Sequence, residues 1–137
     1  MLRDSKHKTG DAAEAAFQLY AACNNWLYCI PMSAALSYDF AACFSKEEGW
    51  LKIQVKHAGT VSPNGGVSAD FRKIDNRSYT SDEVDYYFIY AVSLDRAWLI
   101  PYSEANKTKA TVTGDKYSKY EVYREGFNDP RRVHTND

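Results

Sequence analysis

An alternating segment in the first half of the chain constrains the fold more than any other feature. In the predicted strand Trp50–Lys56, apolar and polar side chains alternate, with Leu51, Ile53 and Val55 set against Lys52, Gln54 and Lys56. This period of two predicts a β-strand with one buried and one polar face. The apolar run Tyr38–Phe44 and the turn residues Ser45–Gly49 precede it. Together they predict an antiparallel hairpin whose apolar face must be covered by another layer.

A helix before the hairpin is predicted to provide that layer. Apolar residues recur with helical spacing at Ala13, Ala16, Phe17 and Tyr20. Thr9 or Asp11 is the expected N-terminal cap, and Asn24-Asn25 ends the helix. Glu14 lies at the edge of the apolar stripe, where a carboxylate is costly unless it has a partner.

The rest of the chain is rich in predicted strands. Trp26–Ile30 is a short apolar strand, and Asp85–Val92 and Ala97–Ile100 form a second hairpin, with Phe71–Ile74 as a further candidate strand. By contrast, Ala58–Ala69 is rich in Gly and Ser, which predicts a flexible loop. Short helical turns are expected at residues 80–83 and 103–106.

One helix followed mainly by strands predicts an α+β domain, with the helix packed on a mixed central sheet of α/β type. At 137 residues and 45% apolar composition, the chain is long enough for one compact domain. We place this domain at residues 1–128 and expect residues 129–137 to form a disordered tail.

The composition also indicates a cellular compartment. No segment approaches the ~20 uninterrupted apolar residues of a membrane helix, and the basic amino-terminal residues lack the apolar segment of a secretory signal. The three cysteines, Cys23, Cys29 and Cys43, form no CxxC pair. Their spacing favours core thiols in a reducing cytoplasm over a zinc site. We expect a cytoplasmic protein that makes no membrane contact.

Asp39 is the most informative polar residue, because it interrupts an apolar strand in which Asp is disfavoured. Directly opposite residues of an antiparallel hairpin share a face. Two registers bring Asp39 to the face of Gln54 and Lys56. In one it lies opposite Gln54, with Cys43 opposite Trp50, and in the other it lies opposite Lys56. A shift of one residue from either register would separate them.

Glu14, Asp39 and the segment Gln54–Lys56 are therefore expected to converge on one cleft. Two carboxylates and an amide oxygen form a hard oxygen site that suits Mg²⁺, with the main-chain carbonyl of Val55 as a further ligand. Such an ion polarises a phosphoryl oxygen and lowers the pKa of a bound water, while the Lys56 ammonium orients the water or offsets the charge growing on the phosphate. This set of residues predicts phosphodiester hydrolysis.

The same residues carry a resemblance to a known family. Gly10-Asp11-Ala12-Ala13-Glu14, Tyr38-Asp39-Phe40 and Gln54-Val55-Lys56 resemble the motifs of the PD-(D/E)xK nuclease superfamily. Within it, the pattern is similar to the archaeal-type Holliday junction resolvases and to a branch of group I intron-encoded homing endonucleases. The run Val84–Tyr90 followed by Trp98–Pro101 also resembles the strands after the catalytic hairpin in those branches.

The resemblance implies a restriction-endonuclease-like core and a homo-oligomer, dimer or tetramer, that cuts both strands of DNA to leave 5′-phosphates. It also implies dependence on Mg²⁺ or another divalent cation such as Mn²⁺. By position, Asp39 is the metal ligand, Glu14 the supporting carboxylate and Lys56 the catalytic lysine. Gln54 departs from the usual Glu or Asp, which removes one negative charge from the metal site. Gln at this position occurs in the homing branch, so the departure favours homing over resolving.

Charge and aromatic content give secondary indications. The net charge is -1, but basic residues predominate around the loop after the hairpin, which permits DNA binding without requiring it. We name five residues there as candidate DNA contacts: Lys52, His57, Arg72, Lys73 and Arg77. The chain has eleven tyrosines; Tyr79, Tyr86, Tyr87 and Tyr90 are possible stacking platforms for bases, although packing in the core or between subunits is favoured for them.

The sequence thus predicts a metal-dependent, site-specific endonuclease of double-stranded DNA, of the intron-encoded homing type, in the nucleoid of a prokaryote or phage. Two alternatives remain open. One is a structure-selective Holliday junction resolvase. The other is an inactive DNA-binding or regulatory module of the same fold, in which Gln54 marks the loss of activity.

Overall fold

The computed structural model of the chain describes residues 5–33 and 35–124. In chain order, its elements are α1 (Ser5–Asn24), β1 (Leu27–Cys29), β2 (Phe40–Cys43), β3 (Leu51–His57), β4 (Thr60–Val61), β5 (Val67–Asp70), β6 (Tyr86–Ala91), β7 (Arg96–Pro101), the 3₁₀ helix η1 (Tyr102–Glu104), β8 (Lys109–Thr111), the 3₁₀ helix η2 (Asp115–Tyr120) and β9 (Glu121–Val122). The predicted tail lies outside the described residues.

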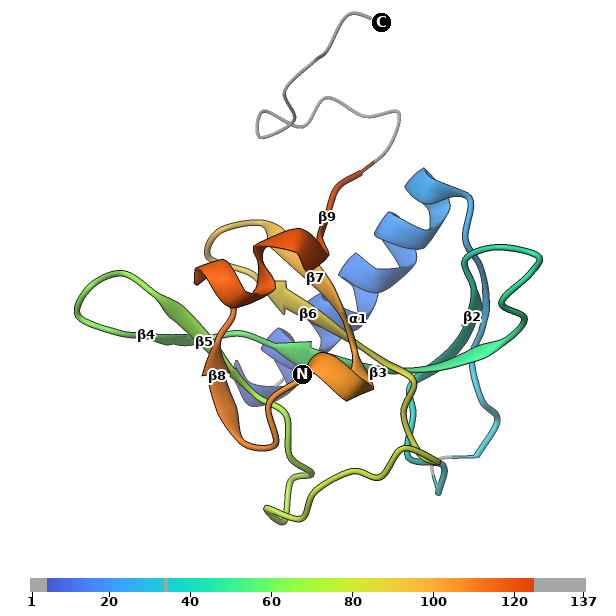
Figure 1. Cartoon of the computed structure of the whole chain (residues 1–137), viewed down its shortest axis with the longest axis horizontal. Helices are drawn as coiled ribbons and strands as arrows, with labels where there is room; N and C mark the ends of the chain where they lie inside the picture. Colours follow the sequence, from blue (N-terminus) through green and yellow to red (C-terminus); the bar gives the residue numbers. More distant parts are fainter. Residues whose placement is uncertain (1–4, 34, 125–137) are drawn as a thin grey trace, which may run out of the picture.

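A six-stranded sheet with the strand order β1-β2-β3-β6-β7-β9 forms the centre of the molecule (Figure 1). β3 and β6 run parallel, paired from Ile53 with Tyr86 to His57 with Tyr90, whereas the other neighbours are antiparallel. A parallel pair needs a crossover connection, and residues 58–85 provide it. The predicted mixed sheet is confirmed.

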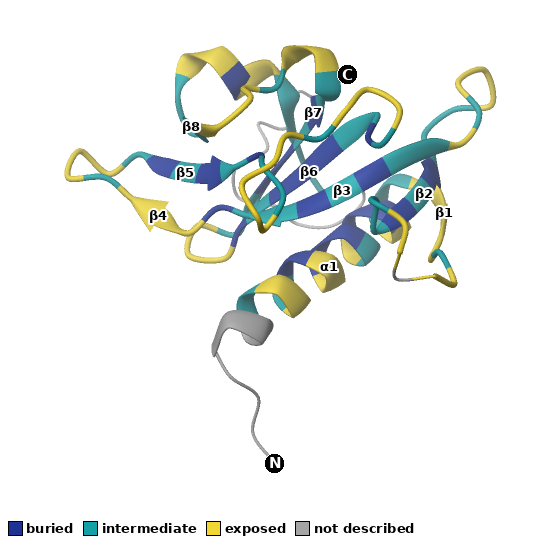
Figure 2. Ribbon diagram, turned by 90° about the horizontal axis from the view of Figure 1, so that it is seen from below, coloured by how far each residue is buried: buried dark blue, intermediate teal, exposed yellow. Residues whose placement is uncertain are grey.

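The helix α1 covers one face of this sheet (Figure 2). Its buried residues Ala13, Phe17 and Tyr20 pack against residues of β2, β3 and β6. The Phe17 ring stacks on Phe40 with their centroids 4.5 Å apart. Burial of one such side chain contributes about 1.5–3 kcal/mol. The helix begins at Ser5, so Thr9 and Asp11 lie within it and the predicted cap is wrong.

A second layer covers part of the opposite face, so β6 and β7 have buried residues on both sides. It consists of the small sheet β4-β5-β8 together with η1 and η2 (Figure 2). Alternation along β6 divides its side chains between the layers, with Phe88 in the core beneath α1 and Tyr87 and Ile89 in the other core. Trp98 of β7 is the largest fully buried side chain of this second core.

The segment Ala58–Ala69, predicted to be a flexible loop, is instead a β-hairpin. Thr60 pairs with Ser68, and β5 continues onto β8 through Ser68 and Thr111. Only the tip, Ser62–Gly66, forms the turn that its residues indicate. The predicted strand Phe71–Ile74 is also wrong, because this segment is irregular and leads into a turn.

The edge strand β1 differs from a core strand in its exposure. All of its residues are exposed to solvent, although the sequence there is apolar. No helix of the described residues is long and apolar enough to cross a membrane.

Candidate active site

Asp39 lies immediately before β2, at the corner of the sheet where pairing with β3 begins. Its main-chain N–H donates to the carbonyl of Ile53 over 2.8 Å, and its Oδ2 accepts a hydrogen bond from the main-chain N–H of Val55 over 2.8 Å. Because β2 begins only at Phe40, the Asp39 carboxylate takes the place of a main-chain acceptor for Val55. An unpaired N–H at this position would be costly, which explains why a carboxylate is tolerated beside an apolar strand.

The hairpin has one of the two predicted registers. Phe40 pairs with Ile53 and Ala42 with Leu51. Extending this register by one residue places Asp39 opposite Gln54, so the alternative with Asp39 opposite Lys56 is excluded. Since Ile53 packs beneath α1, the polar set lies on the face of β3 that points away from the helix.

This polar face opens into a hollow of about 480 Å³. Asp39, Gln54 and Lys56 line one side of it, as the sequence predicted. The remaining lining residues come from the connection before β2 and from the crossover segment: Leu36, Ser37, Lys73, Ile74, Arg77 and Tyr79. Three of the four predicted catalytic residues therefore share one cleft.

Lys56 is held at its ammonium group by the crossover segment. Its Nζ donates to the main-chain carbonyl of Arg72 over 2.6 Å and lies 5.2 Å from the centroid of the Tyr79 ring. Burial lowers the pKa of Lys56, and the negative charges of Asp39 and Asp70 oppose that effect. The ammonium is thus oriented by a carbonyl and an aromatic face, and two nearby carboxylates favour its charged form. Neither Tyr79 nor the Arg72 carbonyl was predicted for this role, because alternation along β3 cannot reveal what the crossover places above it.

Glu14, the fourth predicted residue, reaches the same corner from α1. Its side chain is exposed and does not line the hollow itself. Desolvation raises the pKa of Glu14, and the negative charge of Asp39 raises it further. The two carboxylates are therefore close enough to repel each other. Burial also raises the pKa of Asp39, although its hydrogen bond from Val55 and the charge of Lys56 act in the opposite direction.

Two repelling carboxylates beside neutral oxygen donors are suited to a divalent cation. Gln54 donates from its Nε2 to the carbonyl of Val55 over 3.3 Å, and its Oε1 accepts no hydrogen bond from any described residue. Asp39 likewise keeps one carboxylate oxygen outside its hydrogen bond with Val55. The donor set fits Mg²⁺ or Mn²⁺ by its chemistry. Across residues 5–33 and 35–124, no three His, Cys, Asp or Glu side chains gather into a metal cluster, so the amide and the main-chain carbonyl are needed to complete the set.

The predicted DNA contacts occupy different positions around this cleft. Lys73 and Arg77 line it, but Lys73 is paired with Glu83 over 2.8 Å and Arg77 with Asp75 over 2.6 Å. Arg72 contributes its carbonyl to Lys56, while its guanidinium is paired with Asp70 over 2.9 Å. Every one of these three cations thus has an acidic partner within the protein.

The other two candidates, Lys52 and His57, lie at the two ends of β3. Lys52 donates from its Nζ to the carbonyl of Asp82 over 2.5 Å. The imidazole of His57 lies over Gly59, where a Cβ would come within 2.7 Å of its ring, and burial lowers the pKa of His57. Contact of these five residues with DNA stays a prediction.

Comparison with known proteins agrees with this geometry. The family model described as PD-(D/E)XK endonuclease matches residues 4–124. The fold is similar to that of a bacterial homing endonuclease, I-Ssp6803I, with a TM-score of 0.70, 22% sequence identity, and coverage of 86% of this chain and 89% of that one. No curated protein matches the sequence. Because the family match spans most of the chain, including all four predicted catalytic residues, this protein belongs to the PD-(D/E)XK endonuclease family.

Proposed function

We propose that this nuclease is a metal-dependent, site-specific endonuclease of the homing type, which hydrolyses phosphodiester bonds in double-stranded DNA and leaves 5′-phosphate ends. The observation that carries the proposal is the convergence of Asp39, Gln54 and Lys56 on one cleft, with the Glu14 carboxylate beside Asp39. Family membership supports nuclease activity. The homing type is supported by the fold of the bacterial homing endonuclease and by Gln54.

The residues at this site would have two separate roles, metal binding and stabilisation of the transition state. Asp39, Glu14, Gln54 and the Val55 carbonyl would hold a divalent cation, which when bound polarises the phosphoryl oxygen and acidifies water. Asp39 is fixed for this role by its hydrogen bond with Val55. Lys56 presents a positive charge whose position is set by Arg72 and Tyr79. In the transition state that charge offsets the negative charge that develops on the phosphate.

A homing function would also require more than one subunit. A domain of this size contacts only a limited stretch of duplex, and two cuts need two active sites, so a homodimer or homotetramer is proposed. Sedimentation of the purified chain, alone and with duplex DNA, measures this directly. A particle that sediments as a monomer in both samples would contradict it.

The function is tested by incubating the protein with a library of randomised duplexes and Mg²⁺, then sequencing the newly formed ends. Cleavage at one sequence motif, with 5′-phosphates, is the expected result. Cutting of four-way junctions regardless of sequence would instead identify a resolvase. Binding to DNA without cutting in Mg²⁺ or Mn²⁺ would identify an inactive module.

The matched variants are Asp39→Asn in the cleft and Asp115→Asn in the distant helix η2. Asp39→Asn keeps an acceptor for Val55 but removes the charge that would hold the cation, so cleavage should fall by at least about 100-fold. Asp115→Asn should cut like the parent protein. Equal cleavage by both variants would remove Asp39 from the mechanism.

A further inference from the structure

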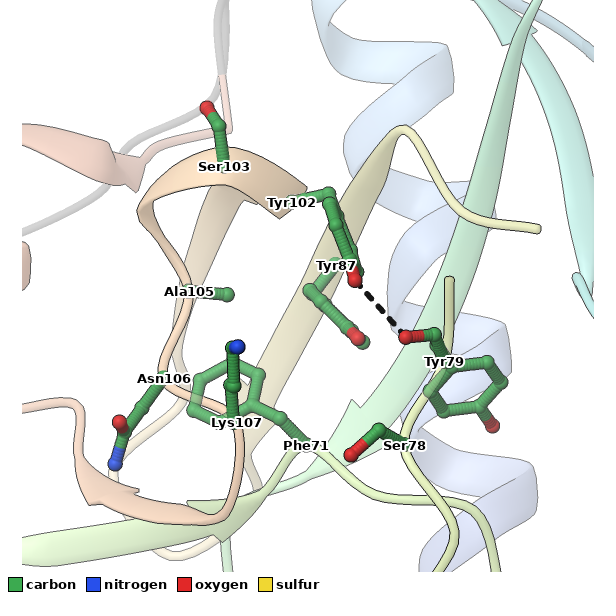
Figure 3. A pocket seen from close by; sticks show the side chains of 9 residues that line it. All are labelled: Phe71, Ser78, Tyr79, Tyr87, Tyr102, Ser103, Ala105, Asn106 and Lys107. Atoms are coloured by element: carbon green, nitrogen blue, oxygen red, sulfur yellow. Dashed lines mark hydrogen bonds between the residues drawn. The ribbon is translucent and has the colours of Figure 1, made fainter. Parts of the chain in front are cut away.

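A second cavity, of about 300 Å³, shares one lining residue, Tyr79, with the catalytic cleft. The two spaces therefore adjoin at this residue. Figure 3 shows the walls of the cavity, which come from the crossover segment, from β6 and from the segment after β7. None of the residues predicted for catalysis or metal binding lines it.

Aromatic rings form most of its inner wall. The Tyr87 ring contacts Phe71 edge-on with centroids 5.1 Å apart, contacts Tyr79 edge-on at 5.9 Å and stacks with Tyr102 at 6.3 Å. The Tyr102 hydroxyl donates to the carbonyl of Tyr79 over 2.9 Å, as the dashed line in Figure 3 shows. This bond ties the segment after β7 to the crossover segment, so the wall is held in place before any ligand enters.

Tyr87 supplies a polar group at the bottom of the cavity. Its side chain is only 2% exposed, and its hydroxyl has no hydrogen-bond partner among residues 5–33 and 35–124. Burial raises the pKa of Tyr87, so the hydroxyl keeps its proton at neutral pH and can both donate and accept. The hydroxyl is not among the fully buried unpaired atoms of the described residues, so it is open to the cavity and available to pair with a ligand.

The mouth of the cavity is polar. Ser78, Ser103, Asn106 and Lys107 line it and are exposed to solvent. Lys107 makes no ion pair within the described part of the chain, in contrast to Lys73 and Arg77 of the catalytic cleft. A matching ligand would have a flat aromatic body for the aromatic walls, polar edge atoms for the Tyr87 hydroxyl and an attached anion for the basic mouth.

We propose that this cavity binds a single nucleobase, unstacked from the substrate DNA beside the cleavage site, with Tyr87 hydrogen-bonded to its edge and Lys107 near its phosphate. Enzymes that take a base out of the duplex read it by stacking on aromatic rings and by hydrogen bonds to its edge. The proposal rests on the proposed function, because the adjoining cleft must hold the DNA backbone. It assigns a role to Tyr87, which does not line the catalytic cleft, and a second role to Tyr79 beside its contact with Lys56.

Saturation-transfer NMR tests the cavity without cleavage, because EDTA is present throughout. The probes are dAMP, dCMP, dGMP and dTMP, with deoxyribose 5-phosphate as the probe that lacks a base. We expect the base protons of at least one nucleotide to receive saturation and deoxyribose 5-phosphate to receive none.

Three variants locate the binding. Ala105→Phe fills the cavity from its wall and should weaken binding at least about tenfold. Tyr87→Phe removes only the hydroxyl and should weaken it about fivefold. Tyr86→Phe makes the same change at the neighbouring residue, which packs with the core beneath α1, and should bind like the parent protein. Circular dichroism confirms folding; should Ala105→Phe fail to fold, Tyr87→Phe against Tyr86→Phe decides.

A competition experiment separates DNA from a free nucleotide as the source of the base. A hairpin duplex with one bulged nucleotide is compared with the same duplex carrying an abasic bulge. If the base comes from DNA, the first should displace the bound nucleotide at a concentration about tenfold lower than the second. Equal displacement would overturn DNA as the source.

Absence of saturation at every base, or equal binding by Tyr87→Phe and Tyr86→Phe, would overturn the cavity assignment itself. These results are distinguishable from failure of the proposed function. A protein that cuts DNA but binds no base would support the proposed function and contradict base binding in the cavity. A protein that binds bases but cuts no DNA would support base binding and contradict the proposed function.

Discussion

Glu14 and Asp39 bring two negative charges together at the corner of the sheet where β2 begins. Desolvation and the charge of Asp39 raise the pKa of Glu14, and burial raises the pKa of Asp39, so the folded protein holds protons that the unfolded chain releases. The free energy of unfolding therefore falls as the pH rises from the ordinary carboxyl pKa through the raised values. At neutral pH, the full repulsion is present unless a cation occupies the site.

Replacing Glu14 by Gln should remove part of this repulsion. In EDTA at neutral pH, we expect the free energy of unfolding of Glu14→Gln to rise by about 0.5 kcal/mol, a small gain because the carboxylate is exposed and screened by solvent. At about pH 3 the difference should vanish, because Glu14 is then protonated in the parent protein as well. Urea unfolding at both pH values measures it.

Glu47→Gln provides the control, because Glu47 is an exposed glutamate in the turn between β2 and β3. It should show no comparable gain. If Glu14→Gln were less stable than the parent protein in EDTA at neutral pH, the carboxylate would have a favourable partner other than a cation.

Among the elements, β3 depends on carboxylates at both of its open corners. The Asp85 Oδ2 accepts from the N–H of Lys52 over 2.7 Å at one end, as the Asp39 Oδ2 does from Val55 at the other. Asp85 lies immediately before β6. It completes the pairing of β3 where the parallel ladder with β6 begins.

Loss of this acceptor should therefore destabilise the sheet. Asp85→Ala leaves the N–H of Lys52 without its partner and should lower the free energy of unfolding by about 1–3 kcal/mol. Asp85→Asn retains an oxygen acceptor and should lose about half as much or less. The exposed neighbour Asp82, changed to Ala, is the control. Urea unfolding that gave the same midpoint for Asp85→Ala and Asp82→Ala would show that the bond contributes nothing.

The elements also show what the sequence could and could not predict. The hairpin, its face and the pair of allowed registers followed from alternation along β3, since a shift of one residue would bury Gln54 and Lys56. Ala58–Ala69 was misread because its strands are short and weakly apolar, and β5 is held by pairing with β8 across a long sequence separation. The position of Tyr79 over Lys56 depends on the same crossover, which no local pattern encodes. Glu14 was predicted to share the cleft with Asp39; the charge of Asp39 does act on it, but the Glu14 side chain is exposed and does not line the hollow.

At the scale of the whole molecule, the three layers bring a weakly charged site to one corner of a nearly neutral protein. The net charge is -1, and Arg72, Lys73 and Arg77 near the cleft are already paired with acids. A bound divalent cation would therefore be a prominent local charge for a phosphate. Any ion that binds the folded state but not the unfolded state also raises the stability of the entire domain.

Thermal unfolding across a Mg²⁺ titration measures how much a bound ion stabilises the domain. The variant Gln54→Glu tests whether that ion binds at this site. The variant adds a third carboxylate beside Asp39 and Glu14, so in EDTA its unfolding midpoint should lie below that of the parent protein. With Mg²⁺ the extra charge faces the ion, and we expect the affinity to rise at least about tenfold and the order of the two midpoints to reverse. Asn64→Asp, which adds the same charge at the tip of the β4–β5 hairpin, should leave both midpoints close to the parent values. A Gln54→Glu midpoint that does not respond to Mg²⁺ would mean that this corner of the sheet is not where the protein binds the ion.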